Sequence, residues 1–162
     1  MATINSINWT NLESVLRDGV DYLTLSAKAN LSGYELKDKI KFDLVIGSNT
    51  YQITFDAPSY WKYVNDGRRP GKYPPPDAIS SWISKKGIVP YKDRSGKIPS
   101  IGSLAFLIGR KISREGTKGN RFLDVAIEDF KKTFTDKIAD AITEDVSSQL
   151  DIFLKPLSNQ MN

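Results

Sequence analysis

Apolar side chains occupy every fourth position along the last quarter of the chain, and no other pattern in the sequence restricts the fold as strongly. A spacing of four predicts an α-helix from residue 122 to about residue 150. Because a helical turn holds 3.6 residues, each step of four overshoots the turn by roughly 40°. The stripe therefore winds most of the way around a straight helix. Its members are Phe122, Ala126, Phe130, Phe134, Ile138, Ile142, Val146 and Leu150.

A stripe that winds in this way cannot be covered by one small domain. We therefore expect the half of the helix from Ile138 onward to pack against another molecule, most simply a second subunit of the same protein. A bend in the helix, or an earlier end, is the alternative explanation. The residues that we assign to subunit packing are Ile138, Ile142, Val146 and Leu150.

A second helix is predicted near the N-terminus. Between residues 10 and 29, apolar side chains recur at steps of three and four, which places them on one helical face. Thr10 and Glu13 fit a capping box, in which each side chain accepts a hydrogen bond from a free backbone N–H group of the first turn. Residues 30–38 are predicted to form a loop.

An antiparallel β-hairpin is predicted next. Apolar and polar residues alternate over residues 40–46 and again over 51–55, which is the period of a strand with one buried face. Gly47, Ser48 and Asn49 lie between them and suit a tight turn. Since an isolated two-stranded hairpin is marginal in water, the sheet must gain strands or pack on helices.

The central part of the chain alternates short helices with loops. A helix over residues 60–65 is followed by an irregular loop, 68–75, whose three prolines lack N–H donors. Pro76 begins the next helix, and Gly87 ends it. The side chains assigned to its buried face are Ala78, Ile79, Trp82 and Ile83.

A basic loop over residues 88–99, which we expect to be mobile, leads to a further helix. Ser100 is its predicted cap and Gly116 its end. The GTKGN segment, 116–120, is predicted to be a loop. The side chains that share the buried face of this helix are Ile101, Leu104, Ala105, Ile108 and Ile112.

These elements predict an α+β fold, in which a small antiparallel sheet packs against an N-terminal helix and a long C-terminal helix, with short helices between. The chain has 162 residues, of which 40% are hydrophobic, and this is enough for one core. We expect a single domain over residues 1–150 and a C-terminal extension over residues 151–162.

The composition argues against an enzyme. The chain has no histidine and no cysteine, and therefore lacks the commonest general base, the commonest metal ligands and a thiolate nucleophile. Four acidic residues of the last helix lie between apolar positions and are interpreted as solvated surface charges. They are Glu128, Asp129, Glu144 and Asp145. We predict no catalytic residue, no cofactor and no metal site.

The sequence also argues against a membrane protein. Its longest apolar runs are far shorter than a membrane span. The first residues, MATINSINW, lack the basic and apolar regions of a secretory signal. We expect a soluble protein that is made in the cytoplasm and does not contact a membrane.

Basic side chains are concentrated in the middle of the chain. Residues 60–121 carry 14 basic and 4 acidic side chains, whereas residues 1–59 and 122–162 have net charges of −2 and −4. Such a block can bind a polyanion such as DNA, or it can pair with the acidic flank of a neighbouring copy. Aromatic residues interleave with the basic ones, which also suits stacking on bases. The sequence leaves these readings open.

Several segments of the middle of the chain stand in a definite order. YWKYVNDGRRP at residues 60–70 and the prolines at 74–76 lead into ISSWISKKGI at 79–88. This order resembles the minor tail-completion and head–tail joining (neck) proteins of tailed double-stranded-DNA bacteriophages. In that family an aromatic segment and a basic proline turn precede a proline-started W-I-x-x-K-G helix. The later segments that resemble the family are LAFLIGRKI at 104–112, EGTK at 115–118 and RFL at 121–123.

The resemblance implies a small α+β structural protein of the virion, without enzymatic activity. Such a protein assembles into a homo-oligomeric ring at the junction between portal and tail, through which the genome passes. Its partners would be further copies of itself, the portal or connector and tail proteins, and genomic DNA through non-specific contacts. Two features depart from the usual pattern, namely the long loop at 88–99 and the continuation of the last helix into LKPLSNQMN.

The alternative function is that of a small non-specific DNA-binding accessory protein of a phage or mobile element, which would use the same basic block. The contacts with a neighbouring subunit or with DNA in the lumen are assigned to two loops. They are Arg68, Arg69 and Lys72 in the proline loop, and Lys92, Arg94 and Lys97 in the loop that follows.

Overall fold

The computed structural model describes residues 7–48, 50–92 and 96–158. Helices predominate, and the strands form small antiparallel sheets, so the predicted α+β fold is confirmed. The chain divides into two compact units. We call residues 1–61 with 121–162 the body, and residues 62–120 the insert. No helix in the described part of the chain is both long and apolar enough to cross a membrane.

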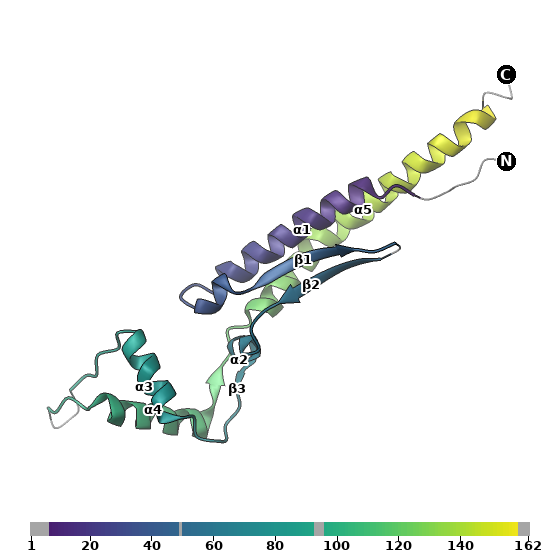
Figure 1. The fold of residues 1–162 in the computed structure, drawn as a ribbon. Coiled ribbons are helices and arrows are strands. Elements are labelled where there is room, and N and C mark those ends of the chain that lie inside the picture. The colour runs from purple at the N-terminus through teal and green to yellow at the C-terminus, as the bar shows by residue number, and fades with distance from the viewer. Residues whose placement is uncertain (1–6, 49, 93–95, 159–162) are drawn as a thin grey trace. The chain divides into compact units, whose positions relative to one another are not determined.

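The body is built on two antiparallel helices, α1 (Thr10–Ala29) and α5 (Phe122–Ser158), which lie side by side in Figure 1. At Gly19 of α1, a Cβ atom would lie 2.6 Å from Cε2 of Phe130. The Phe130 ring in turn stacks on Phe134, with centroids 5.0 Å apart. The predicted apolar face of α1 is confirmed, and its buried residues are Leu12, Leu16, Gly19, Val20, Leu23 and Ala27.

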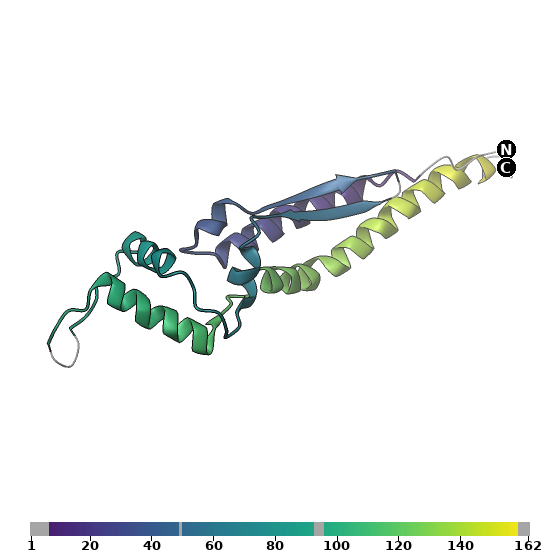
Figure 2. The ribbon, with the colours of Figure 1, turned by 60° about the horizontal axis from the view of Figure 1, so that its bottom comes forward.

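The predicted hairpin is confirmed and belongs to the body. β1 (Lys41–Ile46) pairs with β2 (Tyr51–Asp56), and the pair packs on α1 (Figure 2). Phe42 lies opposite Phe55, with ring centroids 4.9 Å apart. Phe55 also meets Trp61 edge to face at 5.2 Å, so the hairpin gains its stability from aromatic packing and from α1.

Part of the segment predicted as a loop after α1 is helical. It contains a short 3₁₀ helix, η1 (Glu35–Asp38). Leu31, before this turn, and Leu36, within it, are buried and extend the core of the body. The predicted turn residue Asn49 of the hairpin lies outside the described residues.

The apolar stripe of α5 winds away from α1, as its spacing requires. Phe134 is buried, whereas Ile142 and Leu150 are 38% and 46% exposed. Farther along α5, the buried positions are instead Ala141 and Asp145. The second half of the stripe is therefore only partly covered.

α5 is longer than predicted. It continues without interruption to Ser158, so the alternative of an earlier helix end is wrong. Residue 151, where the C-terminal extension was predicted to begin, lies inside this helix. The helix has 37 residues, which at 1.5 Å per residue correspond to a length of roughly 55 Å.

A side chain of α5 caps the N-terminus of α1. The backbone N–H groups of Asn11 and Leu12 donate to the two carboxylate oxygens of Asp145, at 3.0 and 2.9 Å. Asp145 is only 4% exposed, so its interpretation as a solvated surface charge is wrong. Glu128 and Glu144 are exposed as predicted, and Asp129 is half-buried.

The predicted capping box at the start of α1 is wrong. The residue at the N-cap position is Trp9, and its side chain does not cap the helix. The Thr10 hydroxyl donates to the side chain of Asn8 instead. The Glu13 carboxylate instead accepts a hydrogen bond from the Tyr51 hydroxyl at 3.2 Å. Because Asp145 satisfies the first N–H groups, α1 needs no cap from its own sequence.

The insert is centred on two helices, α3 (Pro76–Lys85) and α4 (Ile101–Glu115), which pack on each other. Pro76 begins α3 as predicted, where its missing N–H group costs nothing. Ser100 caps α4 as predicted, since its Oγ accepts from the backbone N–H of Ser103 at 3.1 Å. The buried core between the helices consists of Ile79, Ile83 and Ala105, with Leu104 and Ile108 packed against it.

Several side chains that we assigned to this core are exposed. Trp82 is 47% exposed and Ala78 is also on the surface, because α4 covers only one side of α3. Ile101 in the first turn of α4 is exposed as well. Ile112, toward the other end of α4, is half-buried.

Two short segments predicted as loops form a second antiparallel sheet. α2 (Trp61–Asp66) ends one residue later than predicted and continues into β3 (Gly67–Arg68). β3 pairs with β4 (Thr117–Lys118), which lies in the GTKGN segment. Strands of two residues have no periodicity that a sequence could reveal.

Candidate interface site

The proline loop is tied to the segment after α4 by backbone hydrogen bonds within the insert. In the pairing of β3 with β4, Gly67 lies opposite Lys118. The N–H of Asn120 donates to the Val64 carbonyl at 3.0 Å. The N–H of Gly71 donates to the Ser113 carbonyl at 2.8 Å. The two arginines that follow Gly67 are therefore presented from a backbone that is fixed on both sides.

Three glycines allow these two segments to approach each other. A Cβ atom at Gly67 would lie 2.1 Å from the carbonyl oxygen of Thr117, and one at Gly116 would lie 2.0 Å from that of Arg68. Both glycines also have positive φ angles, 81° and 75°, which other residues rarely adopt. At Gly119 a Cβ atom would lie 2.0 Å from the Asn65 carbonyl oxygen. Only glycine fits at these positions.

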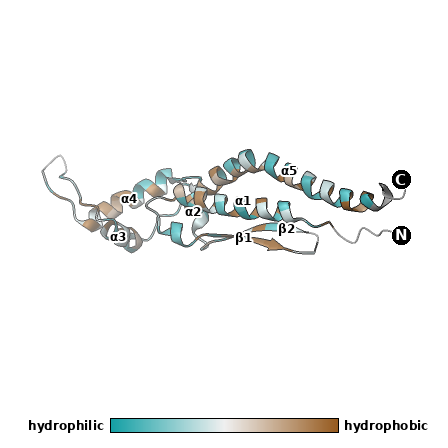
Figure 3. Cartoon of the chain, turned by 90° about the horizontal axis from the view of Figure 1, so that it is seen from above, coloured by the Kyte–Doolittle hydropathy of each residue, from teal (hydrophilic) through white to brown (hydrophobic). Residues whose placement is uncertain are grey.

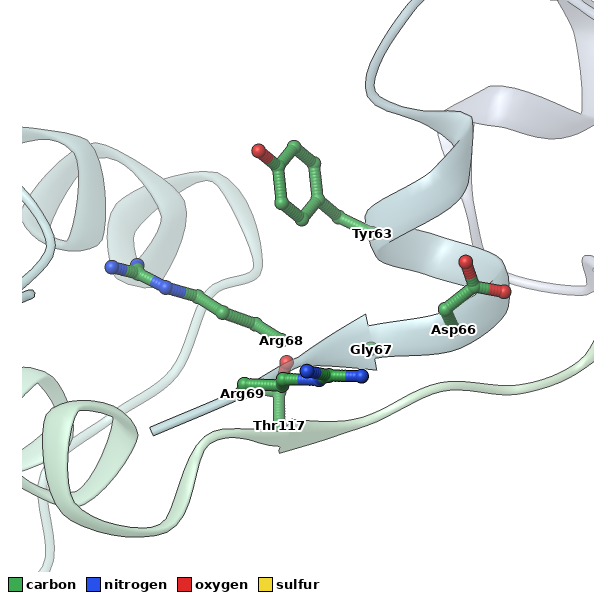
Figure 4. Close-up of a pocket in the computed structure, with 6 residues that line it drawn as sticks. All are labelled: Tyr63, Asp66, Gly67, Arg68, Arg69 and Thr117. Carbon is green, nitrogen blue, oxygen red and sulfur yellow. The ribbon is translucent and has the colours of Figure 1, made fainter. Parts of the chain in front are cut away.

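A pocket of about 670 Å³ opens beside this sheet (Figure 4). Arg68 and Arg69 extend from the end of β3 in different directions, and Tyr63 projects from α2. The Arg68 guanidinium donates to the carbonyl oxygen of Lys72, which closes the loop on itself. The residues that line the pocket are Tyr63, Asp66, Gly67, Arg68, Arg69 and Thr117.

The chemistry of this pocket favours binding over catalysis. Guanidinium groups bind carboxylates and phosphates through paired hydrogen bonds. The Tyr63 ring is 67% exposed beside them and can stack on a planar group. Asp66, the acidic residue of the lining, accepts a hydrogen bond from the Asn65 side chain at 2.6 Å. The site is thus suited to an anionic partner surface.

The structure brings together only part of the residues assigned to interface or DNA contact. Arg68 and Arg69 line the pocket, and Lys72 is exposed on the same loop. Lys92 and Lys97 are exposed on the second loop and do not line the pocket. Arg94 lies outside the described residues.

The residues assigned to subunit packing differ in how far the chain itself covers them. Ile142 and Leu150 are exposed, whereas Ile138 and Val146 are half-buried. Their packing against another subunit stays a prediction. Tyr63 is one of the aromatic residues that interleave with the basic ones in the sequence. Thr117 was not found as a site residue, although the glycines on either side of Thr117 and Lys118 signal a close backbone approach.

Comparison of the chain with protein-family models, with curated proteins and with solved structures found no match.

Proposed function

We propose that the protein is a structural subunit of the virion of a tailed phage, a neck or tail-completion protein that forms a homo-oligomeric ring around the DNA channel. The observation that carries this proposal is that the insert exposes more large apolar side chains than it buries. The exposed ones are Tyr63, Trp82, Ile88, Val89, Tyr91, Ile98, Ile101, Phe106 and Leu107. Exposed large apolar side chains in this number favour a surface that a partner covers.

The charge distribution supports the same proposal. The insert carries 13 basic and 4 acidic side chains, whereas the remaining residues have a net charge of −5. Opposite charges on two parts of one chain favour association between copies over repulsion between them. The order of motifs that resembles the phage neck proteins favours this class of assembly.

The pocket at Arg68 and Arg69 provides the test. The double variant Arg68→Glu, Arg69→Glu should nearly keep the thermal unfolding midpoint of the monomer, because Arg69 is exposed and the bond from Arg68 to the Lys72 carbonyl lies within one exposed loop. We expect it to lose ring formation or attachment to the virion, measured by native mass spectrometry and by electron microscopy of assembled particles. The matched control is Lys37→Glu, Lys39→Glu in the body. Normal assembly of the arginine variant would contradict the proposal.

A second candidate function is non-specific DNA binding by a small accessory protein. It is favoured by one observation, namely that an exposed aromatic ring, Tyr63, lies in the same pocket as two arginines. Titration with duplex and single-stranded DNA at two salt concentrations separates the two functions. Submicromolar and steeply salt-dependent binding by a monomer would establish the second.

A further inference from the structure

The outer side of α4 carries a basic face that the arginine pocket does not include. Its residues follow the spacing i, i+3, i+4 and i+7, so they form one stripe on the helix. All are exposed, and Leu107 supplies apolar area among the charges. Lys111 is paired weakly with Glu115, at 4.0 Å. We call Leu107, Arg110, Lys111 and Arg114 the basic face of α4.

α5 carries an acidic face on the side turned away from α1. With 100° per residue, Asp140 lies roughly 140° around the helix from Asp145, which caps α1. Leu150 and Leu154 are exposed at the edge of this face. Figure 3 shows hydrophilic and hydrophobic residues interspersed along this half of α5. We call the exposed residues Asp136, Asp140, Glu144 and Asp151 the acidic face of α5.

We propose that the basic face of α4 in one copy docks on the acidic face of α5 in a second copy. The inference rests on the proposed ring and names the surfaces that join its subunits. Each face is a helical stripe in which exposed leucine lies beside charges of one sign. The sign is positive on α4 and negative on α5. Such complementarity sets both the choice of partner and the register of the contact.

The charges disfavour contacts between two copies of the same face. Two α5 helices that met through their acidic faces would bring carboxylates together, and two α4 helices would bring guanidinium and ammonium groups together. Like charges in direct apposition disfavour association. The contact that remains is α4 to α5. A reciprocal two-fold dimer would use both faces of each copy, whereas a head-to-tail pair leaves one α4 face and one α5 face unused, to which further copies can add.

A heterologous contact of this kind closes into a ring when the rotation between copies is right. DNA is a less complete partner for these surfaces. It could neutralise Arg110, Lys111 and Arg114, but it would leave the acidic face of α5 and its flanking leucines without a partner. One contact between copies accounts for both faces.

Three full-length variants test this contact by charge reversal. The first carries Arg110→Glu, Lys111→Glu and Arg114→Glu. The second carries Asp140→Lys, Glu144→Lys and Asp151→Lys. The third combines all six changes. Self-association is measured by sedimentation velocity over a concentration series, and circular dichroism melting checks that each variant folds.

We expect each single-face variant to associate at least about 100-fold more weakly than the unchanged protein, because both of its faces then carry the same charge. A one-to-one mixture of the two variants should associate again. Both faces of the first variant are then acidic and both faces of the second are basic, so the two variants attract each other. The six-fold variant should associate on its own. The control Lys28→Glu, Lys37→Glu, Lys41→Glu changes the net charge by the same amount as the first variant and should associate normally.

Other outcomes overturn the inference. If both single-face variants form rings as the unchanged protein does, the subunits join through other surfaces, and the proposed ring function still stands. If the first variant loses affinity for duplex DNA while its oligomeric state is unchanged, the basic face of α4 is a DNA-binding surface. If the unchanged protein stays monomeric throughout the concentration series, the contact between copies does not exist.

Discussion

The carboxylate of Asp145 accepts a hydrogen bond from the backbone N–H of Leu12 at 2.9 Å, although 133 residues separate the two in the sequence. The second carboxylate oxygen accepts from the neighbouring N–H of Asn11. This contact closes the body, because it joins the first turn of α1 to α5 at the point where the apolar stripe of α5 has already turned away.

Replacing Asp145 should destabilise the protein measurably. Asp145→Ala removes both acceptors from the first turn of α1, and loss of such a cap costs about 1–2 kcal/mol of the free energy of unfolding. Asp145→Asn keeps one acceptor oxygen and should lose less. Urea denaturation measures both variants, with Glu144→Gln on the exposed side as the control. An unchanged stability of Asp145→Ala would show that water replaces the cap.

Gly19→Ala should reverse the usual benefit of replacing a helical glycine. In an open helix the change stabilises by up to about 1 kcal/mol. Here the new Cβ atom would lie 2.6 Å from the Phe130 ring, which is held by its stack on Phe134. We expect a net loss of about 1–3 kcal/mol in thermal or urea unfolding.

A double-mutant cycle with Phe130→Leu checks the cause of that loss. The smaller side chain removes the ring that the Cβ atom would meet, so Gly19→Ala should become neutral or stabilising in this background. Equal losses in both backgrounds would mean that the ring is not the obstacle.

Gly119→Ala should be among the most damaging single changes in the insert. Its Cβ atom would lie 2.0 Å from the Asn65 carbonyl oxygen, and a backbone atom cannot move aside as a side chain can. We expect a loss of about 3 kcal/mol or more in urea unfolding. Gly102→Ala in α4 is the matched control, because its nearest neighbour would be Ser100 Oγ at 3.9 Å. Similar effects of the two changes would contradict the close approach of α2 and β4.

The ionisation of Tyr51 should make stability depend on pH in the alkaline range. Partial burial, and then the hydrogen bond to the Glu13 carboxylate, raise the pKa of Tyr51 above its ordinary value of 10.0. The unfolded chain therefore loses this proton at a lower pH than the folded chain. The contribution to stability is complete below pH 10.0 and is lost as the pH rises through the raised pKa.

Two variants measure this contribution. Between pH 10.0 and the raised pKa, unfolding free energy should fall less steeply in Tyr51→Phe than in the unchanged protein. Glu13→Gln should move the Tyr51 pKa back toward its ordinary value, which an ultraviolet difference titration follows. Identical pH profiles for Tyr51→Phe and the unchanged protein would refute the linkage.

The elements of the body could be predicted because each contains its own periodic signal. In α1, β1 and β2 the pattern of apolar and polar residues continues over 6 to 20 positions. This is long enough to distinguish the period of a helix from that of a strand. The winding of the α5 stripe follows from arithmetic on its spacing alone. These predictions depend on local sequence and needed no knowledge of tertiary packing.

The errors arise where tertiary contacts decide. The capping box at Thr10 has the right residue types, but the first N–H groups of α1 are taken by Asp145 from the far end of the chain. Trp82 has helical spacing with Ile79, yet it is 47% exposed, on a part of α3 that α4 does not cover within the described residues. For the site, Arg68 and Arg69 could be chosen from charge and proline content, whereas the pairing of Gly67 with Lys118 could not.

The cap at Asp145 also has a mechanical consequence. Thirteen residues of α5, 146–158, follow this clamp and correspond to roughly 20 Å of helix. Sliding α5 along α1 by one turn would break both hydrogen bonds to the Asp145 carboxylate, so these bonds oppose such a movement. A force on the last turns of α5 therefore acts on α1 through these two bonds as well as through the packed side chains.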